Sequence, residues 1–394
     1  MQLSSQSPDT AFGARVLFVA TSAGYGGIEV HSVNLAAALN RSGTDVVYVC
    51  APEGHVYTLA NDASIQTVPL TVRNSGDVIA SAQLASIIRR LNIDVVHVHS
   101  RRDYVTALLA TAFARTMRRK QVRIIFHVHL VRTLGYPTKL VGCVVRKWVD
   151  KVLVVSEAVR KVVIQEHGLT DSKVSVVYNG VDLSRFYRPE TESYRHQREN
   201  IRKQLKLKPD DVVIGMIGRL DAKGQALLIE LFTGLIEKEP NLRAVLVGPD
   251  GILGDTIRLK KRIQELGIGD RIQFTGIRED IPELLAAMDV FVHLPTDDAL
   301  PTVLIEAMAS ALPIVVTNTG GCPELVEDGV TGRVVETGNM EAIRAALSEC
   351  VDKSTRGQLL AYGRNGRTKA EEQFSLKVQT ATLQKIYQSL CEMP

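Results

Sequence analysis

The residues with the clearest chemical potential lie between Leu294 and Val335 of this 394-residue chain. Two carboxylates there, Asp298 and Glu306, are eight positions apart, and Pro301 stands between them. Proline is favoured at the start of a helix, and the N–H groups and dipole of a helix N-terminus suit an anion such as phosphate. A carboxylate only accepts hydrogen bonds and therefore suits hydroxyl groups. Phosphate beside hydroxyl groups describes a nucleotide sugar.

The two carboxylates also have a simpler structural explanation, because an acid in the first turn of a helix stabilises the helix dipole. Glu306 favours a ligand site, since its neighbours are apolar and predict a largely buried helix: Leu304, Ile305, Ala307 and Met308. A buried carboxylate without a partner is costly. We therefore expect Glu306 to have a partner.

A second motif, GRLDAKG from Gly218 to Gly224, directly follows the apolar run Val212–Ile217. This order predicts that Arg219 and Lys223 emerge at the carboxyl end of a strand, close to a helix N-terminus. Two cations in such a place can hold a diphosphate. The alternative is a pair of surface cations on a loop.

The first predicted strand-to-helix turn reads GYGGIE, from Gly24 to Glu29. Gly26 and Gly27 would let the backbone approach an anion closely. The motif is not G-x-G-x-x-G, and Asp45 begins the second predicted strand instead of ending it, so an NAD-dependent dehydrogenase is disfavoured. A simple tight turn remains the alternative.

Two predicted strands end in H-x-H pairs, His97 with His99 and His127 with His129. Alternation along a strand places the members of each pair on one face. Three interpretations stay open: metal ligands, contacts to a substrate, and packed histidines that bond to each other. The absence of a carboxylate or cysteine at ligand spacing disfavours a metal, and we expect neither a metal site nor a cofactor.

Short runs rich in Val and Ile alternate with amphipathic segments along the whole chain. Runs this apolar are typical of parallel strands covered on both faces. We therefore expect an α/β protein with two doubly wound, Rossmann-like parallel-sheet domains facing a cleft. The expected boundaries are a flexible N-terminus at 1–14, a first domain at 15–187, a linker at 188–200, a second domain at 201–375, and a C-terminal helix at 376–394 that packs back on the first domain.

The composition, with 45% hydrophobic and 23% charged residues, is ordinary for a globular protein. The polar first 14 residues lack the pattern of a signal peptide, and we find no 18-residue apolar run. The five cysteines form no C-x-x-C pair, which favours a reducing compartment. These features predict a cytoplasmic protein.

The segment from Arg115 to Lys151 is strongly basic, with ten Lys and Arg residues and one acid, Asp150. Its second part, Lys139–Lys151, has helical amphipathic spacing. Such a segment suits an anionic partner, for which we expect a membrane surface at the inner face or a lipid-linked acceptor, and no nucleic acid. The alternative is a helix that packs its apolar side on the core and presents its cations to water.

Taken together, these segments resemble the large group 1 family of retaining glycosyltransferases with the GT-B fold. The resemblance covers nearly the whole chain and depends on the order and spacing of many pieces. Besides the motifs above, these are DVVHVH at Asp94–His99, VSEAV at Val155–Val159, VYNGVD at Val177–Asp182 and the GGCPELVEDGVTG segment that begins at Gly320.

The resemblance implies transfer of a sugar from a nucleotide diphosphate sugar to an acceptor hydroxyl, with retention of configuration and without a metal. The acceptor, a lipid-linked sugar or a small molecule, stays open. The implied roles are a diphosphate clamp of Arg219 and Lys223 beside Gly218, phosphate contacts from Gly26, Gly27, Thr302 and Val303, ribose contacts from Glu306, contacts to the transferred sugar from Asp298, and a place near the reacting centre for His129.

Two departures from the family pattern concern the donor site. The first carboxylate is normally a Glu followed by Gly-Phe-Pro, whereas this chain has Asp298 followed by Ala-Leu-Pro. The GRLDAKG turn is also one residue shorter than the common form. A non-catalytic partner of an active transferase and a sugar-nucleotide epimerase of the same fold are therefore kept as alternative functions.

Overall fold

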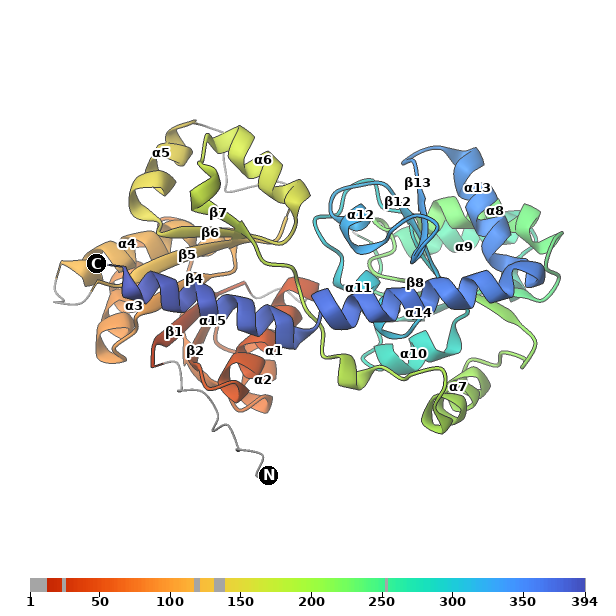
Figure 1. Cartoon of the computed structure of the whole chain (residues 1–394), viewed down its shortest axis with the longest axis horizontal. Coiled ribbons are helices and arrows are strands. Elements are labelled where there is room, and N and C mark those ends of the chain that lie inside the picture. The colour runs from red at the N-terminus through yellow and green to blue at the C-terminus, as the bar shows by residue number, and fades with distance from the viewer. Residues whose placement is uncertain (1–12, 23–25, 117–120, 131–138, 252–253, 394) are drawn as a thin grey trace, which may run out of the picture. The chain divides into compact units, whose positions relative to one another are not determined.

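The computed structural model describes residues 13–22, 26–116, 121–130, 139–251 and 254–393. The chain forms two compact units, drawn in Figure 1. The first unit contains the chain up to Val155, then Val159–Val177 and the residues from Leu376 onward. The second unit contains Ser156–Ala158 and Tyr178–Ser375.

The first unit is built on a seven-stranded parallel sheet with the order β3-β2-β1-β4-β5-β6-β7. Its strands are β1 (Arg15–Ala20), β2 (Asp45–Cys50), β3 (Gln66–Pro69), β4 (Val95–Val98), β5 (Arg123–Val128), β6 (Lys151–Val154) and β7 (Val174–Val176). Its helices are α1 (Gly27–Arg41), α2 (His55–Asp62), α3 (Val78–Arg90), η1 (Arg101–Asp103), α4 (Tyr104–Arg115), α5 (Lys139–Trp148), α6 (Glu157–His167), η2 (Asp171–Lys173) and α15 (Leu376–Glu392).

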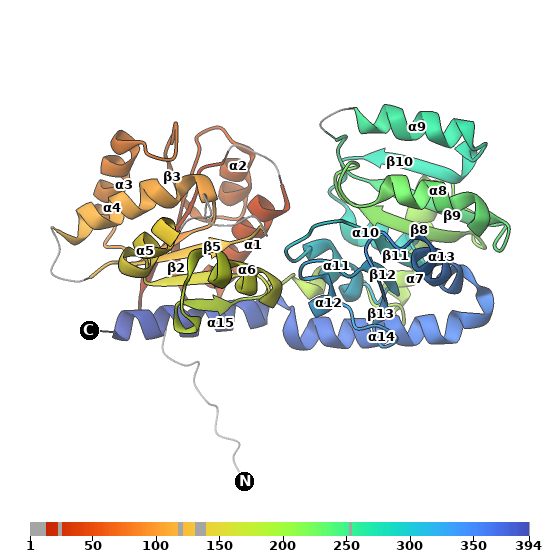
Figure 2. The same ribbon diagram turned by 90° about the horizontal axis from the view of Figure 1, so that it is seen from above.

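Helices cover both faces of this sheet (Figure 2), which is why strands such as β1 and β2 are buried along nearly their whole length. The C-terminal helix α15 packs against α1. Its Leu383 and Tyr387 belong to the same buried cluster as Phe18 and Tyr48 of the sheet. The last helix of the chain is thus part of the core of the first unit.

The second unit has a six-stranded parallel sheet with the order β10-β9-β8-β11-β12-β13. Its strands are β8 (Val212–Ile217), β9 (Leu242–Val247), β10 (Ile272–Gly276), β11 (Val290–His293), β12 (Ile314–Thr317) and β13 (Gly332–Val335). Its helices are η3 (Leu183–Arg185), α7 (Glu192–Gln204), α8 (Gln225–Ile236), α9 (Asp255–Glu265), η4 (Gly269–Arg271), α10 (Ile281–Ala287), α11 (Thr302–Ala309), α12 (Cys322–Leu325), α13 (Met340–Val351), η5 (Lys353–Thr355) and α14 (Arg356–Gln373).

The expected class of fold is confirmed, because both units are α/β structures with parallel sheets. The expected linker at 188–200 is wrong: helix α7 occupies most of it and packs against α10. The segment has few aliphatic residues, and arginines of α7 make its contacts instead. Arg198 and Arg202 bind the two carboxylate oxygens of Asp289 at 2.5 and 2.7 Å. The chain instead enters the second unit at Tyr178.

The order of strands decides where each unit can hold a ligand. In both sheets the strand order reverses beside the first strand, so β1 lies next to β4 and β8 lies next to β11. The loops that leave two such strands diverge and open a crevice at their carboxyl ends. Among the described helices, we find no segment both long and apolar enough to span a membrane.

Candidate functional site

In the second unit, the loop after β11 leads directly into α11, as the sequence predicts. Pro301 precedes the helix, and Thr302 and Val303 are its first residues. N–H groups in the first turn of a helix have no acceptor within the helix, so they are available to an anion.

The turn at Gly320 and Gly321 holds the backbone of this loop in place. Gly321 N–H donates to the carbonyl oxygen of Asp298 at 3.1 Å. Gly320 has a φ of +50°, and a Cβ added to it would lie 1.7 Å from that same oxygen. Only glycine therefore lets the two segments approach so closely.

The Asp298 side chain is the centre of a small charged network with Lys223 and His293, which we call the Asp298 network. Lys223 Nζ forms an ion pair with Asp298 Oδ2, and His293 Nε2 lies 3.0 Å from the same oxygen. Burial raises the pKa of Asp298, but the His293 hydrogen bond and the Lys223 charge outweigh it and leave that pKa below its usual value. Asp298 is therefore a carboxylate, and Oδ1 has no hydrogen-bond partner among the described residues.

His293 acts in this network as a neutral hydrogen-bond donor. It is fully buried, and burial lowers its pKa more than the neighbouring Asp298 raises it. A neutral ring that donates through Nε2 carries its lone pair on Nδ1, and Nδ1 has no partner among the described residues. The ring thus holds one oxygen of Asp298 without adding a charge.

The GRLDAKG turn supplies Lys223 and is held against the same loop. Lys223 O accepts a hydrogen bond from Leu294 N–H at 3.0 Å. Gly224 caps the start of α8 with a φ of +86°, and a Cβ there would lie 2.5 Å from the Cβ of Leu294. Arg219 is different, since its side chain is 51% exposed and pairs with Asp221 at 2.5 Å. The structure thus joins Lys223 to Asp298 and leaves Arg219 at the surface beside Gly218.

Glu306 lies one turn into α11 and is only partly exposed. The expected partner is absent, because its carboxylate makes no hydrogen bond or ion pair within the described part of the chain. Burial raises the pKa of Glu306 to about 7, although the charge of Arg185 opposes the shift. Glu306 therefore holds a proton through much of the acidic range instead of finding a partner.

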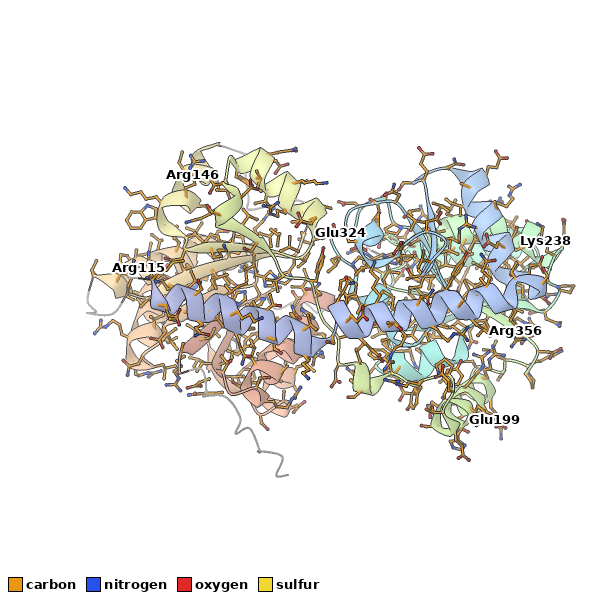
Figure 3. The ribbon with its side chains drawn as sticks, in the orientation of Figure 1. Arg115, Arg146, Glu199, Lys238, Glu324 and Arg356 are labelled. Carbon is orange, nitrogen blue, oxygen red and sulfur yellow. The ribbon has the colours of Figure 1, made fainter. Side chains whose placement is uncertain are left out.

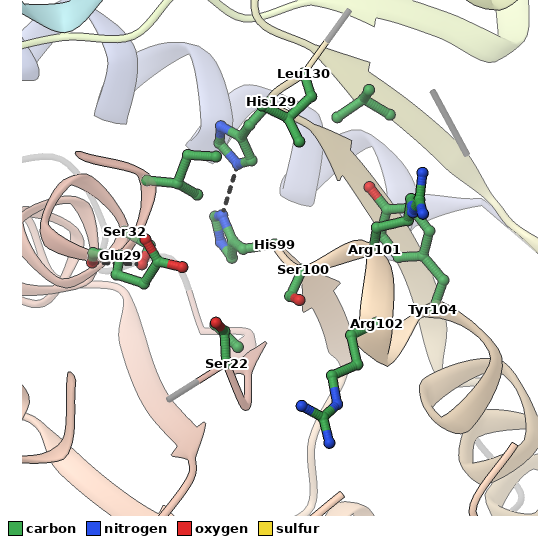
Figure 4. A pocket seen from close by; sticks show the side chains of 13 residues that line it. Ser22, Glu29, Ser32, His99, Ser100, Arg101, Arg102, Tyr104, His129 and Leu130 are labelled. Carbon is green, nitrogen blue, oxygen red and sulfur yellow. Dashed lines mark hydrogen bonds between the residues drawn. The ribbon is translucent and has the colours of Figure 1, made fainter. Parts of the chain in front are cut away.

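The first unit contains a pocket of about 180 Å³ that His129 lines and that Gly26 and Gly27 do not (Figure 4). Gly26 caps α1 and Gly27 begins it, whereas Gly24 lies outside the described residues. The pocket is lined by Ala20, Ser22, Ile28, Glu29, Ser32, His99, Ser100, Arg101, Arg102, Tyr104, Val128, His129 and Leu130. Its lining offers hydroxyl, carboxylate, guanidinium and imidazole groups to a polar ligand.

His129 faces this pocket and is one of four histidines that the sheet brings together. His99 Nδ1 lies 3.2 Å from His129 Nε2, the contact drawn dashed in Figure 4. Deeper in the unit, His97 Nε2 lies 3.2 Å from His127 Nδ1. Burial lowers the pKa of all four, that of His129 to about 3. We call these four neutral residues the histidine cluster.

Comparison with protein families assigns both halves of the chain. Residues 197–369 match the model described as glycosyl transferases group 1. Residues 25–185 match the model of glycosyltransferase family 4. The chain belongs to the group 1 glycosyltransferases.

Individual relatives of this glycosyltransferase are distant. Spore coat protein SA of Bacillus subtilis is 28% identical over 61% of the chain and 65% of its own length, so the match spans less than two thirds of that relative. An Escherichia coli UDP-Gal:alpha-D-GlcNAc-diphosphoundecaprenol alpha-1,3-galactosyltransferase is 24% identical over 87% of the chain and 88% of its own length.

A solved structure supports the fold of the glycosyltransferase. Anabaena HepE, in complex with UDP and glucose, has a TM-score of 0.81 and 23% identity, over 95% of this chain and 100% of that one. At this identity the likeness establishes the GT-B fold alone.

The sequence reasoning missed His293 as a site residue of this glycosyltransferase. The residue ends the apolar strand β11, as the H-x-H pairs end their own strands. The sequence therefore offered one signal for His293, namely that it is a polar residue at the carboxyl end of an otherwise apolar parallel strand, where ligands bind. Its contact with Asp298 could not be read from the sequence, because the intervening loop decides it.

The pKa of Glu306 predicts a pH-dependent stability of the second unit. The folded chain keeps this proton up to about pH 7, whereas an unfolded chain releases it near 4.5. The folded state binds more protons between these values, so the free energy of unfolding should fall as pH rises from 4.5 to about 7. Glu306→Gln should remove this part of the decline.

Urea unfolding of wild type and Glu306→Gln, at about pH 4 and about pH 8, measures the effect. The variant should gain stability relative to wild type only at the higher pH. Glu237→Gln changes an exposed acid of the same unit and is the matched control. An equal pH response of wild type and Glu306→Gln would contradict the raised pKa.

Proposed function

We propose that this protein transfers a sugar from a nucleotide diphosphate sugar to an acceptor hydroxyl, with retention of configuration and without a metal ion. The observation that carries the proposal is the Asp298 network at the N-terminus of α11. It combines a cation for phosphate, a carboxylate with one free oxygen for a hydroxyl group, and a helix start. The family match and a relative named as a UDP-galactose-dependent transferase support the same reaction class.

In the proposed reaction, negative charge develops on the diphosphate as its bond to the sugar breaks. Lys223, Arg219 and the free N–H groups of Thr302 and Val303 would stabilise that charge, a contribution of several kcal/mol per well-placed donor. Gly218 has no side chain and would let the backbone before Arg219 approach the phosphates. Gly26 and Gly27 would allow the same close approach at the start of α1. These groups replace the metal ion that other transferases use.

The two carboxylates would recognise different parts of the donor. Oδ1 of Asp298 is free to accept from a hydroxyl of the transferred sugar, because Lys223 and His293 share Oδ2. Glu306 would accept from the ribose hydroxyls, and those donors would favour its charged form. His129 lines the pocket of the first unit, where we place the acceptor and the reacting centre.

Two other functions differ from this proposal in a measurable way. A non-catalytic partner subunit would bind donor without breaking it, and an epimerase would change the sugar without an acceptor. A thermal-shift screen of nucleoside diphosphates and their sugars identifies the donor, since a ligand at 100 times its Kd adds about 2.7 kcal/mol. Release of nucleoside diphosphate from that donor, with formation of a glycosylated product, tests the transfer itself.

The diphosphate clamp predicts a loss of activity when either cation is removed. Arg219→Ala and Lys223→Ala should each slow transfer roughly a hundredfold or more, because charge on the leaving group is no longer stabilised. Steady-state rates measure the loss, and Lys238→Ala, an exposed cation of the same unit labelled in Figure 3, is the control. Normal turnover in both variants would remove the clamp from the mechanism.

Asp298 and Glu306 should affect different steps. Asp298→Asn should reduce transfer far more than binding of the bare nucleoside diphosphate, because its free oxygen faces the sugar. Glu306→Gln should weaken nucleotide binding more, because its target is ribose. Calorimetric titration and transfer rates of the two variants separate the roles. If both variants bind and turn over like wild type, neither carboxylate contacts the donor.

Metal independence gives a separate prediction. Transfer should not require Mg²⁺ or Mn²⁺, since cationic side chains and helix N–H groups occupy the role of the metal. Rates in EDTA, with and without the two ions added back in excess, measure this. Activity that Mg²⁺ or Mn²⁺ restores after chelation would contradict the proposed clamp.

Several cations of the basic segment in the first unit are already paired within the protein, so fewer are available to a partner than the sequence indicates. Arg115 and Arg123 both pair with Asp150, and Arg146 donates to the Gly168 carbonyl. Arg115 and Arg146 are labelled in Figure 3. Four members of the segment, Arg118, Arg119, Lys120 and Arg132, lie outside the described residues, and the side chain of Lys139 is also not described.

Helix α5 nevertheless keeps an apolar pair on its outer side. Gly142 and Val145 face the core, and a Cβ at Gly142 would lie 1.8 Å from the His167 carbonyl. Val144 and Trp148, one turn apart, are 40% and 41% exposed. An exposed tryptophan beside cations is typical of a helix that lies on a membrane surface, which favours a lipid-linked acceptor.

Trp148 is the one tryptophan of the chain, so its fluorescence reports directly on this surface. On vesicles rich in anionic lipid at low salt, its emission should shift to the blue, and the protein should co-sediment less as salt rises. Trp148→Ser should weaken sedimentation, whereas Ile257→Ser, at an exposed apolar residue of the other unit, should not. Absence of vesicle binding would point to a soluble acceptor.

A further inference from the structure

The histidine cluster has a geometry that the proposed sugar transfer does not use. His97, in β4, and His99, just after it, stack with ring centroids 4.3 Å apart, and His127 and His129, at the end of β5 and just after it, are tilted with centroids 4.2 Å apart. Because β4 and β5 are neighbouring parallel strands, the two pairs lie side by side, with near-parallel rings at 5.2 Å for His97 and His127 and at 5.5 Å for His99 and His129. His97, His99 and His127 are at most 3% exposed.

We propose that His97, His99 and His127 form a binding site for one divalent transition-metal ion that prefers imidazole ligands, such as Zn²⁺, Co²⁺ or Ni²⁺. One ring nitrogen from each of the three lies within 4.8 Å of the other two. A tetrahedral ion with bonds of about 2.0–2.1 Å places neighbouring nitrogens about 3.3–3.4 Å apart. His97 Nε2 and His127 Nδ1, at 3.2 Å, already have nearly that separation.

Tyr387 of α15 prepares His97 for this role. Its hydroxyl lies 2.6 Å from His97 Nδ1, which fixes the ring and directs Nε2 toward His127. Metal-bound histidines commonly use their second nitrogen in such a hydrogen bond, which sets the tautomer and the ring orientation. The support for the site therefore comes from a helix at the far end of the chain.

The cluster also contains a buried ring nitrogen that can serve as the third ligand. Nε2 of His99 has no hydrogen-bond partner among the described residues. Unpaired buried polar atoms are rare, and a bound ion is one way in which a protein satisfies them. Burial lowers the pKa of these rings, so near neutral pH no proton competes with a metal.

The ligand types select the class of ion. Three neutral imidazoles without a carboxylate suit Zn²⁺, Co²⁺, Ni²⁺ or Cu²⁺, whereas Mg²⁺ and Ca²⁺ require oxygen ligands. His99 also lines the pocket of the first unit, which gives an ion a path of entry and room for a fourth ligand. The absence of nearby carboxylates had disfavoured a metal in the sequence, but the pairing of two H-x-H strands supplies enough ligands without one.

Cobalt binding tests the proposal without any reference to sugar transfer. The full chain without a polyhistidine tag is stripped with EDTA, dialysed and titrated with Co²⁺ while visible absorption and bound metal per chain are measured. We expect one Co²⁺ per chain with the intense absorption of a tetrahedral site, and displacement by Zn²⁺ but not by Mg²⁺. Failure of wild type to bind, or binding with octahedral absorption only, would overturn the site.

Variants locate the ion. His97→Asn should abolish the one-to-one binding, and Tyr387→Phe, which keeps the aromatic packing, should weaken it roughly tenfold through loss of ring orientation. His196→Gln changes an exposed histidine of the second unit and should bind like wild type. If His97→Asn does not fold, Tyr387→Phe still decides: unchanged affinity there, or loss of binding in His196→Gln, would overturn the proposal.

Discussion

The ion pair of the partly buried Asp298 with Lys223 is the interaction on which the candidate site of the second unit depends. The backbone carbonyl of Asp298 is held by Gly321, and its Oδ2 by Lys223 and His293. Three separate segments of the chain thus meet at one residue. Removing one partner of this partly buried pair would leave the other charge uncompensated and only partly solvated, which is unfavourable. The network therefore has a structural role as well as a chemical one, because it holds the Lys223 side chain in position before any ligand binds.

Sheet topology explains why chemistry gathers at the same relative place in both units. In each sheet the order reverses beside the first strand, and the loops after the two central strands diverge. In the second unit these are the GRLDAKG turn after β8 and the Asp298 loop after β11. In the first unit they are the start of α1 after β1 and the segment after β4, which line the pocket. Both candidate sites thus follow from the same feature, the reversal of strand order beside the first strand of each sheet.

The sequence predicts most of the fold because strands buried on both faces must be continuously apolar, and runs such as that of β8 are easily recognised. Helix α7 was missed for the converse reason: its contacts are made by Arg198 and Arg202, which a hydrophobic pattern does not reveal. Lys223 and Asp298 were identified, but their direct pairing depends on a loop conformation that Gly320 and Gly321 impose. Local spacing carries no such information.

The replacement of a glutamate by Asp298 has a physical consequence within this network. An aspartate is one methylene shorter, so its carboxylate lies nearer the backbone, where His293 and Lys223 can both reach a single oxygen. The other oxygen then has a fixed direction, which a longer and more flexible side chain would lack. In the proposed donor site, a short, rigid acceptor would contact fewer positions on a sugar ring but discriminate between them more strongly, because a misplaced hydroxyl would leave Oδ1 of Asp298 without a hydrogen-bond donor. Under the proposed function, His293 and Asp298 would therefore act together in selecting the donor sugar.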